Sequence, residues 1–247
     1  MKAFVRKWLL PNSSREYLDR YNRAFAETAE KGMLVLDAGA GEQPYARYFA
    51  HCTYESADFE MVDKAYARST YVCDLAQIPT ADARFDRIMF NQVMEHLPEP
   101  SLVLSELFRV LKPGGTLICT CPFYYEEHEK PYDFYRYTQF AHRHLFARAG
   151  FEIDRLEWLE GYFGTLAYQL QTMALHLPVA PRRYCRPPWW PILFWPVIIT
   201  AKASALLLAA LFCRLDIACK VTDRGHPKNY VILAHRPLHG PVFSPPA

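Results

Sequence analysis

The sequence lacks the features that mark secreted, metal-binding and nucleic-acid-binding proteins. Its seven cysteines form no CxxC pair and no zinc-type spacing, which indicates reduced thiols in a cytoplasmic protein and predicts no bound metal. The first residues hold no apolar run of about 7 or more, so we expect no signal peptide. A net charge of only +2 over 247 residues argues against a large nucleic-acid interface. These absences favour a cytoplasmic protein that binds no nucleic acid.

A long stretch in the last part of the chain lacks acidic residues. Residues 161–213 contain no Asp or Glu. Four basic residues are the only formal charges there, namely Arg182, Arg183, Arg186 and Lys202. The rest is apolar, with six prolines between 178 and 196 and tryptophans at 189, 190 and 195. This is not the composition of an ordinary solvated insertion.

We expect this stretch to be a helical insertion that docks on a membrane surface, at the inner face of the membrane, through residues 161–219. Tryptophan prefers the headgroup level, and arginine is attracted there by anionic lipid. A single transmembrane span is not expected, because Pro196 and Lys202 leave an uninterrupted apolar run of only 11 residues, 203–213, where a span needs about 20. Two alternatives stay open, a helical lid over an active site and a homodimer interface.

Residues 35–45, VLDAGAGEQPY, indicate a strand followed by a glycine turn. The apolar run 33–36 suits a buried strand, and Gly39 and Gly41 let the turn bring backbone amides close to a ligand. No third glycine stands near Gln43, so the pattern disfavours a dinucleotide. A nucleotide-type pocket is indicated, with an ordinary turn after a core strand as the alternative.

Acids stand at the carboxyl ends of three successive predicted strands. Asp37 follows the first, Asp58 ends the second and Asp74 follows the third. Asp58 comes 21 residues after Asp37, close to the spacing at which an acid on the second strand reaches ribose hydroxyls. Glu55 and Glu60 are the alternatives for that role. Because the carboxyl ends of parallel strands meet at one edge of a sheet, these acids predict a ligand site there.

Strand and helix patterns alternate along the chain. The expected strands are 33–36, 53–59, 70–72, 85–90, 116–121, 151–156 and 229–234. The expected helices begin with a capping box at Ser13 and continue at 45–50 and 101–111, and a further helix is capped by Thr138 and ended by Gly150. This alternation predicts an α/β fold with a doubly wound parallel sheet.

Five segments, in their order and spacing, resemble the class I S-adenosylmethionine-dependent methyltransferases, in particular small-molecule enzymes of the methyltransferase type 11 kind. They are VLDAGAGEQPY, ESADF, CDL, FDRIMFNQVMEHL and LFRVLKPGGTLICTCPF. The resemblance covers residues 30–157 and the strand near 229–235. It implies a Rossmann-like, seven-stranded, mostly parallel sheet with a helical insertion between the last two strands. On this basis, 1–160 and 223–237 form the cofactor-binding domain, 161–222 form the insertion and 238–247 form a flexible tail.

The resemblance implies S-adenosylmethionine as the cofactor. It places the cofactor against Asp37, Gly39, Ala40, Gly41, Asp58, Phe59, Asp74, Leu75, Asn91 and Gln92. Within this set, Asp58 would accept from the ribose hydroxyls and Asp74 from the adenine amine, while Asn91 and Gln92 would line the sulfonium side.

A dense aromatic and charged segment, 122–138, follows the fifth predicted strand. We expect it to form a wall of the acceptor site. Its candidate acceptor-binding residues are Tyr125, Tyr135, Arg136 and Tyr137. The alternative is structural, with Asp133 paired to Arg136 and Thr138 capping the next helix.

Methyl transfer to a hydroxyl needs a general base. His96 is the leading candidate because it follows the fourth strand and imidazole titrates near neutral pH, and His128 and Asp133 are further candidates. His96 could instead cap the turn before Pro98. We expect transfer to an oxygen of a small-molecule or lipid-linked acceptor, such as a glycan or isoprenoid-type intermediate. The alternatives are a C- or N-methyltransferase on a small metabolite, and a non-catalytic methyltransferase-fold assembly partner at the membrane.

Overall fold

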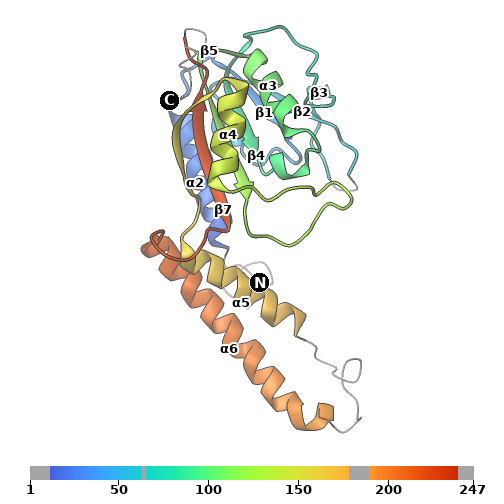
Figure 1. Cartoon of the computed structure of the whole chain (residues 1–247), viewed down its shortest axis with the longest axis vertical. Helices are drawn as coiled ribbons and strands as arrows, with labels where there is room; N and C mark the ends of the chain where they lie inside the picture. Colours follow the sequence, from blue (N-terminus) through green and yellow to red (C-terminus); the bar gives the residue numbers. More distant parts are fainter. Residues whose placement is uncertain (1–11, 63–64, 178–189, 239–247) are drawn as a thin grey trace. The chain divides into compact units, whose positions relative to one another are not determined.

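The computed structural model describes residues 12–62, 65–177 and 190–238. They fall into two compact units (Figure 1). One contains residues 18–159 and the strand that follows residue 228, and it is built around a sheet. The other contains residues 12–17 and 160–228, and its described part is mainly helical.

Seven strands form one sheet in the order β3-β2-β1-β4-β5-β7-β6. They are β1 (Leu34–Ala38), β2 (Thr53–Asp58), β3 (Tyr71–Val72), β4 (Phe85–Asn91), β5 (Leu111–Pro122), β6 (Glu152–Trp158) and β7 (Asn229–His235). All neighbours pair in parallel except β7, which runs antiparallel to β5 and β6. The predicted fold class, a doubly wound and mostly parallel seven-stranded sheet, is confirmed.

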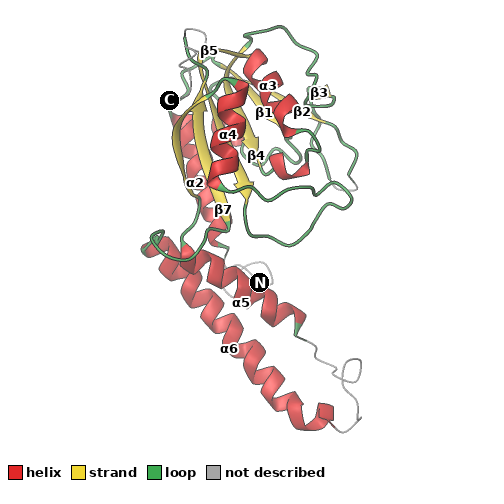
Figure 2. Cartoon of the chain, in the orientation of Figure 1, coloured by secondary structure: helices red, strands yellow, loops and turns green. Residues whose placement is uncertain are grey.

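Helices α3 (Pro100–Val110) and α4 (Gln139–Ala149) lie in front of the sheet in Figure 2. Among the described residues, the other helical elements before α3 are α2 (Ser13–Glu27) and the short 3-10 helices η1 (Ala46–Phe49) and η2 (Met94–His96). Phe25 of α2 packs edge-on against Phe49 of η1, with ring centroids 6.4 Å apart.

The core is built on the two central strands. Leu36 of β1 and Ile88 and Phe90 of β4 are fully buried, and α3 adds Leu104 and Leu107 from one helix face. Parallel strands that are buried on both faces need cover on both sides, which explains why most buried positions of these strands are apolar. The core therefore fixes where β1 and β4 end, and polar residues follow at those ends.

Two predicted helix starts are corrected. Helix α2 is capped by Asn12, whose Oδ1 accepts from the Arg15 backbone N–H at 3.3 Å, instead of by Ser13. Asparagine is at least as good an N-cap as serine, which accounts for the shift by one residue. Helix α3 begins at Pro100 instead of being capped by Ser101, because the fixed φ of proline suits the first helical position.

Of the other helix predictions, one is corrected and one is confirmed. The segment 45–50 forms only the four-residue helix η1, because Tyr45 at its start provides no side-chain cap. The cap of α4 is confirmed, since the Thr138 side chain accepts from the Ala141 backbone N–H. Its end at Gly150, which has a left-handed φ of 96°, is confirmed as well.

The second unit contains a pair of helices, α5 (Tyr162–His176) and α6 (Trp190–Ala218). The rings of Phe163 and Phe212 stack between them with centroids 5.6 Å apart. The expectation that Pro196 and Lys202 interrupt this region is corrected, because α6 continues through both. Lys202 Nζ donates to the Leu177 carbonyl at the end of α5 at 2.8 Å, where a positive charge is favourable.

The turn after β1 requires glycine at position 39 for two reasons: its φ is positive, and a side chain there would clash with Val93. Variants can distinguish the two effects. Gly39 has φ of +76°, and a Cβ there would lie 2.3 Å from Val93 Cγ2. Gly39→Ala should destabilise the protein by about 1–3 kcal/mol in urea denaturation, through backbone strain and overpacking. Gly32→Ala is the matched control, because Gly32 has φ of +84° but open space around it. Adding Val93→Ala should recover part of the loss only at Gly39, and equal losses in the two single variants would contradict the clash.

Candidate active site

A cavity of about 260 Å³ lies at the carboxyl ends of β1, β2, β3 and β4. Its walls come from the residues that follow these four strands and from the loop between β5 and α4. The lining residues are Gly39, Asp58, Phe59, Asp74, Leu75, Gln92, Val93, His96, Leu97, Pro98, Glu129, Tyr132 and Phe134. Seven of the residues predicted for cofactor binding or catalysis are therefore brought together in one place.

The strand register explains why these residues meet. Asp37 of β1 pairs with Ser56 of β2 and with Met89 of β4, and Asp58 of β2 pairs with Val72 of β3. The four strands therefore end at almost the same level. Each chain turn that follows then contributes its first residues to the same edge, as in other doubly wound sheets.

Asp58 is held in a fixed orientation at this edge. Its Oδ2 accepts from the Gly41 backbone N–H at 2.9 Å, and its Oδ1 accepts from the Glu60 backbone N–H at 3.1 Å. Asp74 is fixed similarly, with Oδ1 accepting from the Ala76 backbone N–H at 2.8 Å. A carboxylate oxygen has further lone pairs, so both acids can still accept hydrogen bonds from a ligand.

The lining residues fit S-adenosylmethionine. Phe59 and Leu75 provide apolar surface beside the two acids, as an adenosine group requires. The amide nitrogen Nε2 of Gln92, which also lines the cavity, is buried and has no hydrogen-bond partner among the described residues. A buried donor of this kind is costly unless a ligand satisfies it. In the bound state Asp58 would hold the ribose, and Asp74 with Leu75 would hold the adenine.

Four predicted cofactor residues do not line the cavity. Gly41 acts through its amide on Asp58, and Ala40 is buried in the same turn. Asn91 turns to other partners: its Nδ2 donates to Asn22 Oδ1 at 2.8 Å, and its Oδ1 accepts from Thr120 Oγ1 at 3.0 Å. The fourth predicted cofactor residue that does not line the cavity is Asp37.

Asp37 lies inside the sheet and accepts from the Tyr54 hydroxyl at 2.5 Å. Burial raises the pKa of Asp37 to about 7, and the Asp58 carboxylate adds to the rise. Its charge therefore changes within the physiological pH range.

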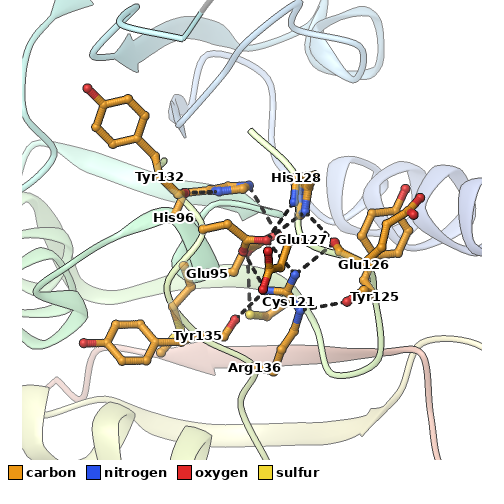
Figure 3. Close-up of polar contacts among 12 residues, drawn as sticks. Glu95, His96, Cys121, Tyr125, Glu126, Glu127, His128, Tyr132, Tyr135 and Arg136 are labelled. Carbon is orange, nitrogen blue, oxygen red and sulfur yellow. Dashed lines mark hydrogen bonds and ion pairs between the residues drawn. The ribbon is translucent and has the colours of Figure 1, made fainter. Parts of the chain in front are cut away.

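The β5–α4 loop closes the cavity by docking on η2. The backbone N–H groups of Phe134 and Tyr135 donate to the Glu95 carbonyl at 2.9 and 3.3 Å, and Tyr137 Oη donates to the Met94 carbonyl at 3.1 Å. These bonds hold the loop as a wall, and Figure 3 shows Tyr132 and Tyr135 of the loop close to Glu95 and His96. The Tyr132 ring packs edge-on against Phe59, with ring centroids 5.6 Å apart.

Asp133 and Arg136 form a bidentate ion pair inside this loop. The two guanidinium nitrogens donate to the two Asp133 oxygens at 2.6 and 2.8 Å. Although burial alone would raise it, the pKa of Asp133 is lowered to about 2 by Arg136 and by the His128 backbone N–H. A carboxylate with such a low pKa is a weak base. The alternative interpretation, in which Asp133 and Arg136 form a structural pair, is the arrangement observed.

The predicted acceptor-binding residues of the loop differ in exposure. Tyr137 is buried, while Tyr135 donates its hydroxyl to the Pro98 carbonyl at 3.1 Å and keeps 42% of its surface exposed. Tyr125 is 38% exposed and meets the His128 ring edge-on at 5.0 Å. Arg136 donates to three backbone carbonyls besides Asp133. None of these four residues lines the cavity itself.

His96 is the predicted base that does line the cavity. Its Nδ1 lies 2.5 Å from the Tyr132 carbonyl, which can only accept, so Nδ1 carries the proton and Nε2 has a free lone pair. Burial lowers the pKa of His96, so the ring is neutral at pH 7. The His128 ring lies edge-on to it, with centroids 4.7 Å apart.

Sequence reasoning missed Glu95, which precedes His96 in η2. Its side chain is fully buried, and burial raises the pKa of Glu95 to about 8. Glu95, His96 and His128 offer one potential metal-ligand atom each, and these atoms lie within 4.8 Å of one another. The only sequence signal was the Glu-His pair itself, because a buried acid and an exposed acid look alike in one sequence.

The chain is similar to known methyltransferases in sequence. A family model of a methyltransferase domain matches residues 10–159. The chain is 33% identical over 99 residues to malonyl-[acyl-carrier protein] O-methyltransferase of Erwinia billingiae, a match that covers 37% of this chain and 39% of that protein. It is 42% identical over 97 residues to the ubiquinone/menaquinone biosynthesis C-methyltransferase UbiE of Desulfotalea psychrophila, covering 34% and 39%. The matches thus span about two fifths of the length of these relatives.

Solved structures show the same fold. The [4+2]-cyclase SpnF is 20% identical with a TM-score of 0.56, and the match covers 90% of this chain and 82% of that chain. Phosphoethanolamine N-methyltransferase 2 of Haemonchus contortus, in complex with S-adenosyl-L-methionine, is 17% identical with a TM-score of 0.50, covering 95% and 56%.

The pKa of Asp37 makes a pH-dependent affinity for S-adenosylhomocysteine testable. Asp37 does not line the cavity but comes two residues before Gly39, which does, so a ligand ammonium group bound at this turn would favour the ionised form of Asp37. Asp37 is mostly neutral at pH 5.5 and mostly ionised at pH 7.5. Calorimetry should therefore show affinity rising by about tenfold or more between these pH values. Asp37→Asn should remove most of this rise, while Asp82→Asn, an exposed acid outside the cavity, should keep it. The same pH dependence in Asp37→Asn protein would contradict the assignment.

Proposed function

The chain belongs to the class I S-adenosylmethionine-dependent methyltransferases, and from that premise we propose that it transfers the cofactor's methyl group to an oxygen of a small or lipid-linked acceptor. A glycan or isoprenoid-type intermediate is the acceptor class that we favour. The observation that carries the proposal is one cavity that combines two fixed acids, Asp58 and Asp74, with a neutral histidine, His96.

The residues of the cavity have separate roles in methyl transfer. Bound S-adenosylmethionine supplies a sulfonium methyl group that a nucleophile displaces in line. Asp58 and Asp74 orient the adenosine part, and Tyr132 and Phe134 exclude water from the opposite wall. His96 accepts the acceptor's proton at Nε2. The Tyr132 carbonyl holds the ring proton on Nδ1, so Nε2 is unprotonated.

The charge of the cavity supports an acceptor without an exposed phosphate at the reacting end. Its ionisable lining residues are Asp58, Asp74, Glu129 and His96, and no Lys or Arg belongs to the described lining. Arg136 could otherwise bind a phosphate group, but it is paired with Asp133. Aromatic walls and acids suit a polyol or an isoprenoid-derived ring better than a phosphoryl group.

Oxygen is favoured over carbon or nitrogen because of His96. A hydroxyl acceptor needs a base within reach, whereas carbon and nitrogen acceptors can react without one. The relatives themselves include a protein named as an O-methyltransferase and one named as a C-methyltransferase. The fold is also shared with a protein described as a cyclase, so the site and not the fold must decide the reaction.

Labelled methyl transfer tests this function. Wild-type protein, S-adenosylmethionine with a labelled methyl group and cell lipid or nucleotide-sugar extracts should yield an O-methylated product. His96→Asn should reduce turnover about 100-fold, because the amide cannot accept the proton, while Asp58→Ala should weaken S-adenosylhomocysteine binding by about tenfold or more. A product labelled on carbon or nitrogen would contradict transfer to oxygen, and absence of cofactor binding by the wild type would contradict the enzyme itself.

We also propose that the second unit attaches the protein to the inner face of a membrane. Within the described residues, one helical segment, Phe194–Ala218 of α6, has the length and composition needed to cross a membrane. Only 17% of its apolar window is buried. Large apolar side chains are exposed along it, including Trp195, Val197, Ile199, Leu207 and Leu211. Exposure on this scale is unusual for a monomer in water.

Lipid is the occupant that this surface fits best. The segment has 25 residues, about 37 Å of helix, and its exposed apolar side chains can enter the acyl boundary of one membrane face along this length. Trp195 can lie at headgroup level. The predicted contributions of Trp189, Arg182, Arg183 and Arg186 lie outside the described residues. A lid or a homodimer interface would bury the same side chains. The next experiment distinguishes both of these alternatives from attachment to lipid.

Charged substitutions on α6 test membrane attachment. Leu207→Lys with Leu211→Lys places two charges on residues that are 69% and 49% exposed, so folding should be kept while binding to liposomes falls about tenfold or more. The matched control is Leu102→Lys with Phe140→Lys, because these residues are 57% and 72% exposed in the other unit. Flotation and size-exclusion chromatography measure the two properties. Unchanged flotation, or a dimer that dissociates in the α6 variant without any lipid binding, would contradict the proposal.

A further inference from the structure

Two histidines and a glutamate converge beside the cavity from two separate parts of the chain. Glu95 and His96 belong to η2, and His128 belongs to the β5–α4 loop. Figure 3 shows their side chains directed toward one another, and one potential ligand atom from each lies within 4.8 Å of the other two. We propose that these three residues bind one divalent transition-metal ion. The inference rests on the proposed methyl transfer to oxygen and says how that oxygen is activated.

Both histidines keep one ring nitrogen unprotonated and available as a metal ligand. The Nδ1 atom of His96 donates to the Tyr132 carbonyl at 2.5 Å. The Nδ1 atom of His128 lies 3.2 Å from the Glu126 carbonyl and 3.3 Å from Asp133 Oδ2, and both of these oxygens only accept. Each Nδ1 therefore carries the proton, and each Nε2 keeps its lone pair. Metal-binding histidines are oriented in this way, with a carbonyl or carboxylate behind the ring.

Glu95 lacks the partner that a buried carboxylate needs. It is fully buried, and its Oε1 has no hydrogen bond among the described residues. The thiol of Cys121 is 3.7 Å from Oε2, a weak donor at long distance. The nearby cation, Arg136, is bound by Asp133. A metal ion between Glu95 and the histidines would supply the missing positive charge.

The distances and the donor types indicate the class of ion. Bonds of about 2.1 Å hold donor pairs roughly 3–3.5 Å apart, and His96 Nε2 is 3.8 Å from Glu95 Oε1. The three donor atoms lie within 4.8 Å of one another, so side-chain rotations that shorten these separations to the bound spacing would complete the set. Two imidazoles and one carboxylate suit Zn²⁺, Mn²⁺, Fe²⁺ or Co²⁺ better than Mg²⁺ or Ca²⁺, and leave positions open for a further ligand.

The open position would face the cavity, because His96 is both a ligand and a lining residue. An acceptor hydroxyl bound there would lose its proton to water, since a Lewis acid lowers the pKa of a bound hydroxyl. Its oxygen would then form the new bond to the methyl carbon, and the carbon–sulfur bond would break with its electron pair left on sulfur. With the ion bound, His96 Nε2 would hold the ion, and the role of proton acceptor that we propose for His96 above would pass to water.

Metal titration of the full chain tests this inference without any acceptor. Protein dialysed against a chelator, and then freed of it, is titrated with Zn²⁺ by calorimetry and with Co²⁺ by visible absorption. We expect one ion per chain, and a loss of affinity of about tenfold or more in Glu95→Gln and in His128→Ala. His128 is 29% exposed at its side chain, so its variant should fold. His144→Ala, an exposed histidine on α4, is the control and should bind as the wild type does.

Two results would overturn the metal site: no binding at millimolar Zn²⁺, or equal affinity in Glu95→Gln, His128→Ala and wild type. S-Adenosylhomocysteine binding is measured on the same samples. If it is retained while the metal fails to bind, the metal site is wrong and the proposed function stands. If the cofactor product fails to bind wild-type protein, the proposed function is contradicted independently of the metal result.

Discussion

The parallel pairing of β1 with β2 and β4 is the constraint on which the site depends. Because Asp37 is paired with both Ser56 and Met89, the turns after these strands begin at one level. Gly39, Asp58 and Gln92 then reach the same cavity although they are far apart in sequence. A shift of one strand by a single residue would turn alternate side chains to the opposite face and separate these groups. The buried apolar strands therefore determine the geometry of the polar edge.

The second wall of the cavity depends on a polar network instead of an apolar core. The β5–α4 loop is held by backbone bonds to Glu95, and its charges are satisfied within the loop by the Asp133–Arg136 pair. This arrangement places His128 against His96 and leaves Glu95 buried beside them. A loop rich in aromatic and charged residues can thus form a wall while Tyr125 and Tyr135 stay partly exposed. This loop builds one wall of the cavity.

Much of the fold and of the cofactor side could be predicted from the sequence, because both follow from local patterns. Alternation of apolar strands and amphipathic helices gives the sheet, and acids after successive strands mark its ligand edge, which is how Asp58 and Asp74 were found. The roles of Asn91 and Asp133 depend on partners distant in the sequence, Asn22 and Arg136 among them, and no local pattern reveals such pairing. Glu95 was missed for the same reason, since its burial is a property of the packed loop. Pro196 and Lys202 were expected to interrupt an apolar run, but α6 continues through both, and Lys202 donates to the Leu177 carbonyl at the end of α5.

We propose that the strand ends bind the adenosine part of the cofactor. A crystal structure of the full chain with S-adenosylhomocysteine would test this binding site. We expect density for the ribose hydroxyls on Asp58 and for the adenine between Asp74 and Leu75. Density for the ligand at any other site, with the cavity at the carboxyl ends of β1 to β4 filled by water alone, would contradict it.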